Sequence, residues 1–136
     1  MDKFQDALDV LGRVFIAWFF VPAGVGKIAG YAGTAAAMAS QGLPGFLLPL
    51  VIVLEIGGGL AILAGWHTRI AAFLLGGFSV LAVWFFHVKL ASGLFGQTNV
   101  AMAELALAGA LFMVAAHGPG RWSVDACRGC ARDDKA

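Results

Sequence analysis

Charged side chains are scarce in this chain, and their scarcity excludes an ordinary soluble domain. Only 12% of its 136 residues are Asp, Glu, Lys or Arg, against about 25% in soluble domains. Nine basic and eight acidic residues nearly cancel, so the chain lacks the basic surface by which proteins bind nucleic acids. Hydrophobic residues make up 60% of the sequence. This composition predicts one integral membrane protein whose first partner is the lipid bilayer.

Cysteine is also rare, which limits the metal chemistry open to the chain. Cys127 and Cys130 form a C-x-x-C near the C-terminus. Two thiols cannot complete a four-ligand zinc or iron–sulfur site. They are therefore weak metal candidates that need a partner, or they are simply reduced and solvated. No Ser-His-Asp set, phosphate loop or dinucleotide motif is present. We therefore expect no catalysis by the chain alone.

Long apolar runs take the place of charge. Four of them cover residues 8–26, 46–64, 70–86 and 100–116. Each is long enough to cross about 30 Å of hydrocarbon as a helix, and an open sheet would leave backbone groups unpaired in lipid. The predicted fold is therefore all-α, a four-helix transmembrane bundle. The N-terminus lacks the basic region and cleavage site of a signal peptide, so we expect the first run to be retained as a span.

An even number of spans places both termini on one side of the membrane. The cations expected on that side, besides one inside the first span, are Lys3, Arg69, Arg121, Arg128, Arg132 and Lys135. The opposite side holds Lys27 and Lys89. Because basic residues are enriched in cytoplasmic loops, the chain is predicted to cross a bacterial inner membrane with both termini in the cytoplasm.

The connection from 27 to 45 is the only long one, and it is predicted to hold a short helix. Thr34 is a candidate N-cap for a helix over 35–41, and Gly42 is its expected stop. This helix would lie at the outer interface, or it would be an ordinary connection. At the other end of the chain, residues 1–125 are predicted to form the membrane domain, and residues 126–136 a flexible cytoplasmic tail.

Glu55 is the most informative residue, because it lies in the middle of an apolar run with nine uncharged residues on either side. A carboxylate at that depth is costly, so it is expected to face the bundle interior and to have a partner. Arg13, inside the first span, is the leading partner, since a guanidinium suits a carboxylate. The alternative is that Arg13 extends to the cytoplasmic head groups.

Three further polar residues are expected near the outer ends of their spans: Lys27, His87 and Glu104. Together with Glu55 they would form a polar pocket that opens outward and suits proton transfer or ligand binding. The alternative is that Lys27 and His87 are interfacial anchors and that only Glu104 is buried.

Several short strings, in this order and spacing, resemble the DoxX family of small four-helix membrane proteins. They are Gly12-Arg13, Gly24-Val25-Gly26-Lys27, Gly33-Thr34, Met38, Gly42-Leu43-Pro44, Glu55-Ile56-Gly57-Gly58-Gly59, Gly65 to Thr68-Arg69, Phe86-His87, Gly118-Pro119-Gly120 and Ser123-Val124-Asp125. The resemblance covers about residues 10–125. One departure is Ala103-Glu104, which stands where the family commonly has a Lys-Asn pair.

The resemblance implies a membrane subunit of an oxidoreductase or oxidative-stress complex, with a quinone as candidate cofactor and a soluble or membrane oxidoreductase as partner. The polar positions that it carries over are Arg13, Lys27, Glu55, Arg69 and His87, of which Arg69 is assigned a structural role. Two other functions remain open. One is a permease, or its accessory subunit, for small molecules or metal ions, for which a homo-oligomer is expected. The other is a non-catalytic scaffold.

Overall fold

The computed structural model describes residues 2–88 and 98–133, and over these residues it contains helices and turns without strands. The helices are α1 (Asp2–Ala29), α2 (Tyr31–Ser40), α3 (Leu47–Ala64), α4 (Thr68–Ala82), the π-helix η1 (Val83–Val88) that continues it, α5 (Thr98–His117) and α6 (Val124–Asp133). Four helical stretches are long and apolar enough to cross a membrane: Asp2–Ala29, Leu47–Ala64, Thr68–Phe86 and Val100–His117. The prediction of an all-α bundle is confirmed.

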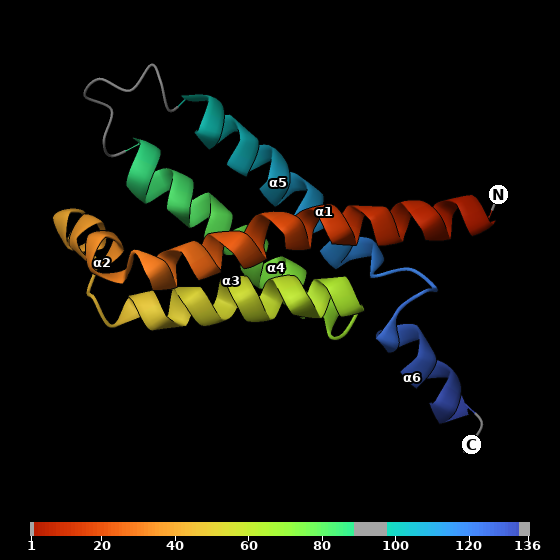
Figure 1. Cartoon of the computed structure of the whole chain (residues 1–136). Coiled ribbons are helices and arrows are strands. Elements are labelled where there is room, and N and C mark those ends of the chain that lie inside the picture. Colours follow the sequence, from red (N-terminus) through yellow and green to blue (C-terminus); the bar gives the residue numbers. More distant parts are fainter. Residues whose placement is uncertain (1, 89–97, 134–136) are drawn as a thin grey trace.

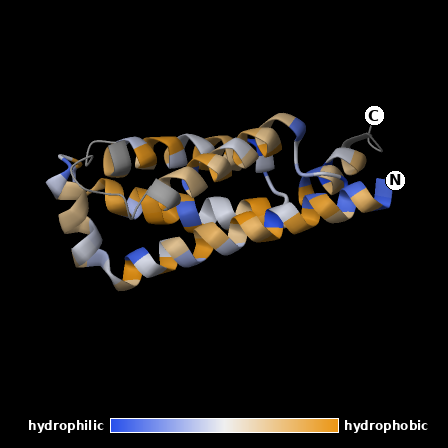
Figure 2. Ribbon diagram, turned by 90° about the horizontal axis from the view of Figure 1, so that it is seen from above, coloured by the Kyte–Doolittle hydropathy of each residue, from blue (hydrophilic) through white to orange (hydrophobic). Residues whose placement is uncertain are grey.

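The four long helices pack in sequence, with α1 against α3, α3 against α4, and α4 against α5 (Figure 1). The core at their centre consists of Ile16, Phe20, Ile62, Ala71, Ala72, Leu75 and Leu111. Other large apolar side chains point outward; Trp18, for example, is 78% exposed. Hydrophobic residues therefore cover the outside of the long helices as well (Figure 2). This is the expected surface of helices solvated by lipid.

Glycines bring the helices close together. A Cβ atom on Gly59 of α3 would lie 3.0 Å from Val21 Cγ2 on α1. One on Gly58 would lie 3.0 Å from Leu75 Cδ1 on α4. Small residues at these positions let α3 fit between its two neighbours, as in other membrane bundles.

Helix α2 begins earlier than the sequence suggested. Thr34 is inside the helix, where its Oγ1 donates to the carbonyl of Gly30 at 3.0 Å, so the prediction that it is the N-cap is wrong. The cause is that only Gly30 separates α1 from α2. The expected stop is confirmed: Gly42 has a φ of 76°, and Leu43 N–H donates to Met38 O, which together make a Schellman ending.

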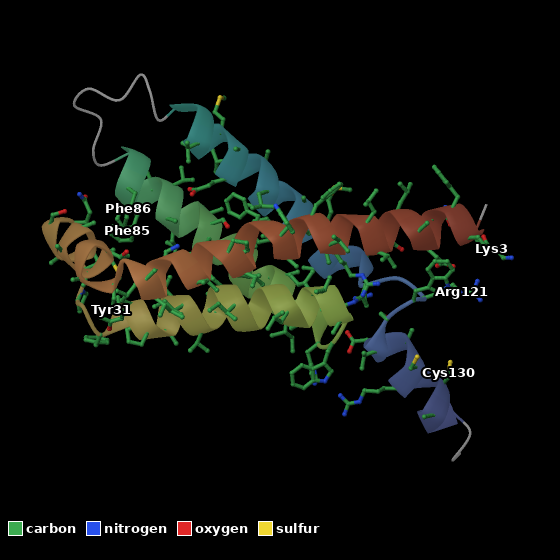
Figure 3. The ribbon with its side chains drawn as sticks, viewed as in Figure 1. Lys3, Tyr31, Phe85, Phe86, Arg121 and Cys130 are labelled. Carbon is green, nitrogen blue, oxygen red and sulfur yellow. The ribbon has the colours of Figure 1, made fainter. Side chains whose placement is uncertain are left out.

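Helix α2 covers one end of the bundle. Its Met38 is buried together with Leu48 and Ile52 of α3, and Phe86 of η1 packs against this cluster. In Figure 3, Tyr31, Phe85 and Phe86 lie at this end, whereas Lys3, Arg121 and Cys130 lie at the other. A π-helical turn is often found at functional sites, and η1 contributes Phe86 to this end of the bundle.

The expectation of a flexible tail over 126–136 stays a prediction, but the C-terminal segment is helical as far as Asp133. The reason is a local cap. Ser123 Oγ accepts a hydrogen bond from Ala126 N–H at 3.2 Å and donates one to Gly120 O at 2.7 Å, which starts α6. Helix α6 stands away from the bundle, at the same end as the start of α1 (Figure 1).

Candidate functional site

A buried ion pair joins α1 to α3. Lys27 Nζ lies 2.9 Å from Glu55 Oε1, and this is the only salt bridge found among the described residues. The side chain of Glu55 is 5% exposed and that of Lys27 is 27% exposed. The prediction that Glu55 has a cationic partner is therefore confirmed. The prediction that this partner is Arg13 is wrong, because the partner is Lys27.

Gly24 explains why Lys27 reaches the carboxylate. A Cβ atom on Gly24 would lie 2.6 Å from Ile56 Cγ1 and 3.3 Å from Glu55 Cβ. Because Gly24 has no side chain, α1 lies directly on the turn of α3 that carries Glu55. Lys27 follows three residues later and therefore extends from the same face of α1.

The second oxygen of Glu55, Oε2, is buried and accepts no hydrogen bond from any described residue. Glu104 on α5 lies within electrostatic reach of Glu55 and is partly buried. Ile56, the next residue of α3, packs against the Met38 cluster. The site thus places one ammonium and a second carboxylate within electrostatic reach of Glu55. His87 belongs to η1, but its side chain lies outside the described residues, so its role stays a prediction.

Arg13 lies at the other end of α3. It is 3% exposed, and its Nη1 donates to Leu63 O at 3.3 Å while Nη2 donates to Trp122 O. It neither pairs with Glu55 nor extends to lipid head groups. Leu63 is eight residues from Glu55, about 12 Å along the helix, which exceeds the length of an arginine side chain. Arg13 therefore ties α1 to the end of α3 and to the segment before α6.

Asp125 completes this second network. Its Oδ1 and Oδ2 accept hydrogen bonds from the backbone N–H groups of His67 at 2.9 Å and Thr68 at 3.0 Å. Its own N–H donates to Gly65 O at 2.8 Å. The first turn of α4 is thus capped by a residue far away in the sequence. His67 has a φ of 46°, which is uncommon for a residue with a side chain, and Asp125 holds this turn in place.

These bonds set the titration of Asp125. Burial raises its pKa, but hydrogen bonds from the backbone of Thr68 and His67 outweigh burial and hold the pKa below the usual 3.8. The stabilisation of the fold by this cap is therefore fully present at pH values above the usual pKa of Asp. It is lost as the pH falls through the lower pKa that Asp125 has in the folded protein.

We predict that Asp125→Asn lowers the free energy of unfolding by about 1 kcal/mol at neutral pH, because the amide keeps one acceptor oxygen in place of two. Denaturant titration of the purified protein would measure this loss. The gap between wild type and variant should narrow below pH 4. A gap that is constant from neutral pH to pH 3 would contradict the assignment.

The family model of DoxX matches residues 8–88, more than half of the chain. The chain belongs to the DoxX family. The inner membrane protein YqjF of Escherichia coli (strain K12) is 43% identical over 125 residues, which cover 92% of this chain and 95% of that protein. No solved structure matches the chain.

The DoxX match covers the Lys27–Glu55 pair and Arg13, and it ends before Glu104 and α6. Arg69, within the matched region, links two helices. Its Nη2 donates to His117 O at 3.4 Å, and its side chain lies beside Gly118. It joins the start of α4 to the end of α5. No ligand function is visible for it among the described contacts.

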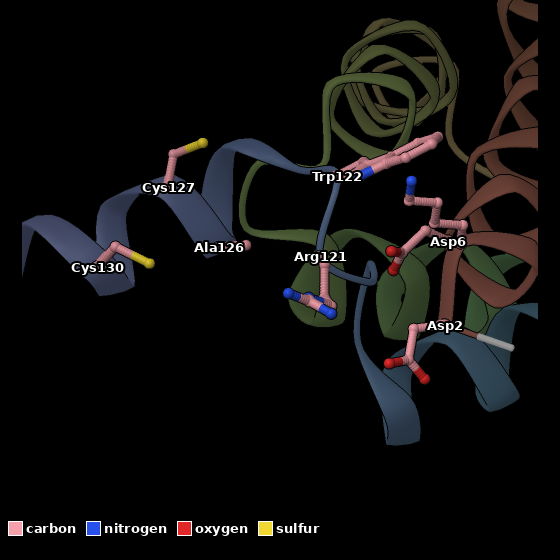
Figure 4. A pocket seen from close by; sticks show the side chains of 8 residues that line it. Asp2, Asp6, Arg121, Trp122, Ala126, Cys127 and Cys130 are labelled. Carbon is pink, nitrogen blue, oxygen red and sulfur yellow. The ribbon is translucent and has the colours of Figure 1, made fainter.

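The two cysteines lie outside the DoxX match, on the exposed side of α6. They border a pocket of about 930 Å³ together with Asp2 and Asp6 of α1 (Figure 4). Within the part of the chain that the structure describes, no three His, Cys, Asp or Glu side chains are grouped to hold a metal ion.

Proposed function

We propose that this DoxX-family protein is a membrane subunit of a quinone-linked redox system, and that Lys27 and Glu55 bind the head group of the quinone or quinol. The observation that carries the proposal is the free acceptor Oε2 of Glu55 beside the Lys27 ammonium. A buried charged pair with an unused acceptor at membrane depth is typical of a functional site.

The chemistry of the pair fits both oxidation states of such a ligand. A quinone carries two carbonyl oxygens, which need hydrogen-bond donors, and Lys27 has two N–H groups beyond the one directed at Glu55. A quinol carries hydroxyl groups, which need acceptors, and Glu55 Oε2 is one. When bound, the quinone would supply the two-electron chemistry, with electrons from a partner oxidoreductase. The part of this chain is to orient the head group and to hold a proton at Glu55, beside Glu104.

The surroundings of the pair support the same role. The Met38 cluster of α2 and α3 packs against Ile56, so apolar side chains border the pair on the α2 side. A low dielectric strengthens each hydrogen bond made to a head group there. The apolar tail of a quinone would remain in the surrounding lipid.

The test is binding of a short-chain quinone to the purified protein in detergent, measured by equilibrium dialysis. We expect Glu55→Gln to weaken binding by about tenfold, because the charged acceptor is lost. Lys3→Gln is the matched control, since Lys3 is exposed at the other end of α1. Equal binding by wild type, Glu55→Gln and Lys27→Gln, each with its helical content intact, would refute the site.

A scaffold is the second candidate, and it is favoured by the two networks that tie the helices together, one at Arg13 and one at Glu55. The double variant Lys27→Met/Glu55→Leu separates the two functions. A scaffold would keep its cellular role in a strain that depends on this protein, because an apolar pair can pack the same helices. A quinone site would lose its function.

We further propose that the chain lies in a bacterial inner membrane with α6 in the cytoplasm. The basic residues Lys3, Arg69, Arg121 and Arg128 belong to the end of the bundle that carries α6, which agrees with the positive-inside rule. The similar Escherichia coli protein is named for the inner membrane.

The native cysteines test this orientation without any added tag, because the only two in the chain, Cys127 and Cys130, are exposed on α6. A membrane-impermeant maleimide should label them in inverted vesicles and not in intact spheroplasts. The variant Cys127→Ser/Cys130→Ser gives the background. Labelling in intact spheroplasts would reverse the proposed topology.

A further inference from the structure

Helix α6 is amphipathic. At 3.6 residues per turn, Val124, Cys127 and Ala131 share one side of the helix, Arg128 lies at the edge of that side, and Asp125 lies further round the helix. The first three residues border a groove of about 540 Å³ between α6 and the end of α3. The bundle does not cover this apolar side of α6, so another molecule can occupy the groove.

The groove lies at the level where a span ends. Ala64, the last residue of α3, lines it together with Trp122. Trp122 is 55% exposed, and Trp66 just after α3 is 49% exposed. Tryptophan is enriched at the boundary between hydrocarbon and water. The groove therefore opens at the level of the lipid head groups.

The groove is positively charged at its rim. Arg121 and Arg128 line it, and none of its eight lining residues is acidic. The nearest carboxylate in the sequence, Asp125, is engaged by the backbone of His67 and Thr68. Asp2 and Asp6 border the larger pocket on the other side of Arg121, but neither forms a salt bridge with it within the described residues. Two guanidinium groups thus remain available to an anion.

We propose that this groove binds the head group of an anionic phospholipid. Arg121 and Arg128 hold the phosphate, since guanidinium groups match phosphate oxygens in geometry and charge. The start of the acyl chains lies along Ala64, Trp122 and Val124. Charge complementarity and the level of the groove both select this occupant, because anionic lipids surround a membrane protein at its cytoplasmic face. The site is independent of the Lys27–Glu55 pair at the opposite end of the bundle.

Native mass spectrometry of the purified full chain, titrated with phosphatidylglycerol or with phosphatidylcholine, tests this site. We expect wild type to retain phosphatidylglycerol preferentially, and Arg121→Gln/Arg128→Gln to lose about tenfold of that preference. Lys3→Gln/Lys135→Gln is the control with equal loss of charge. Both double variants should keep the helical circular dichroism of wild type, which shows that the fold is intact.

Three results would overturn the proposal. One is equal retention of the two lipids by wild type. Another is an equal loss of preference in the control double variant, which would show that the effect depends only on the net charge of the protein. The third is displacement of the lipid by millimolar inorganic phosphate together with an equal thermal stabilisation by phosphate alone, which would identify a site for the free anion.

Discussion

Replacing Lys27 by methionine should lower the free energy of unfolding by about 3–5 kcal/mol, the usual cost of leaving a buried charge without its partner. Glu55 is 3% exposed, and its Oε2 already accepts no hydrogen bond from the described residues. Without Lys27, Oε1 would lose its ammonium at 2.9 Å as well. Glu104, within electrostatic reach, adds a like charge. Methionine keeps nearly the length of lysine, so the loss reports the charge and not a cavity.

The measurement is unfolding in mixed detergent micelles, followed by circular dichroism. Lys3→Met is the control, since it removes an exposed lysine from the same helix. The double variant Lys27→Met/Glu55→Leu should recover most of the lost stability, because an apolar pair can replace a buried ion pair at little cost. If the double variant is as unstable as Lys27→Met, the loss comes from packing and the electrostatic explanation fails.

The sequence could predict the spans and the buried carboxylate, because both depend on hydropathy along the chain. It could not predict the partner of Glu55. Arg13 was predicted as the partner and Lys27 as part of an outer pocket, but the choice between them depends on how α1 and α3 lie against each other. That contact is set by Gly24 against Ile56, which no apolar pattern reveals.

The hydrogen bonds of Arg13 could not be predicted from the sequence for a different reason. Its acceptors are the backbone carbonyls of Leu63 and Trp122, and every residue carries a carbonyl. Asp125 caps α4 across 57 residues, so no local capping signal marks it. Ser123 could have been recognised as the N-cap of α6 from its position before Val124-Asp125-Ala126.

Replacing Arg13 by methionine should lower the free energy of unfolding by about 2–4 kcal/mol, because two hydrogen bonds from a charged donor are lost. Arg13 is buried at 3% exposure, and Gly65 leaves room for it: a Cβ atom on Gly65 would lie 2.5 Å from Nη1. Arg13→Lys should recover only part of the loss, since one ammonium cannot span both carbonyls as a guanidinium does. The same unfolding assay applies, with the exposed Arg121→Met as control.

Double-mutant cycles can decide which cation, Arg13 or Lys27, interacts with Glu55. Arg13 and Lys27 are 14 residues apart on α1, about 21 Å, so the losses from Arg13→Met and Glu55→Gln should add within about 0.5 kcal/mol. The losses from Lys27→Met and Glu55→Gln should not add, because these side chains touch. A coupling of Glu55 to Arg13 above about 1 kcal/mol, with none to Lys27, would restore the pairing that the sequence suggested. Additivity with Arg13 would leave Lys27 as the residue that fixes the carboxylate in the membrane.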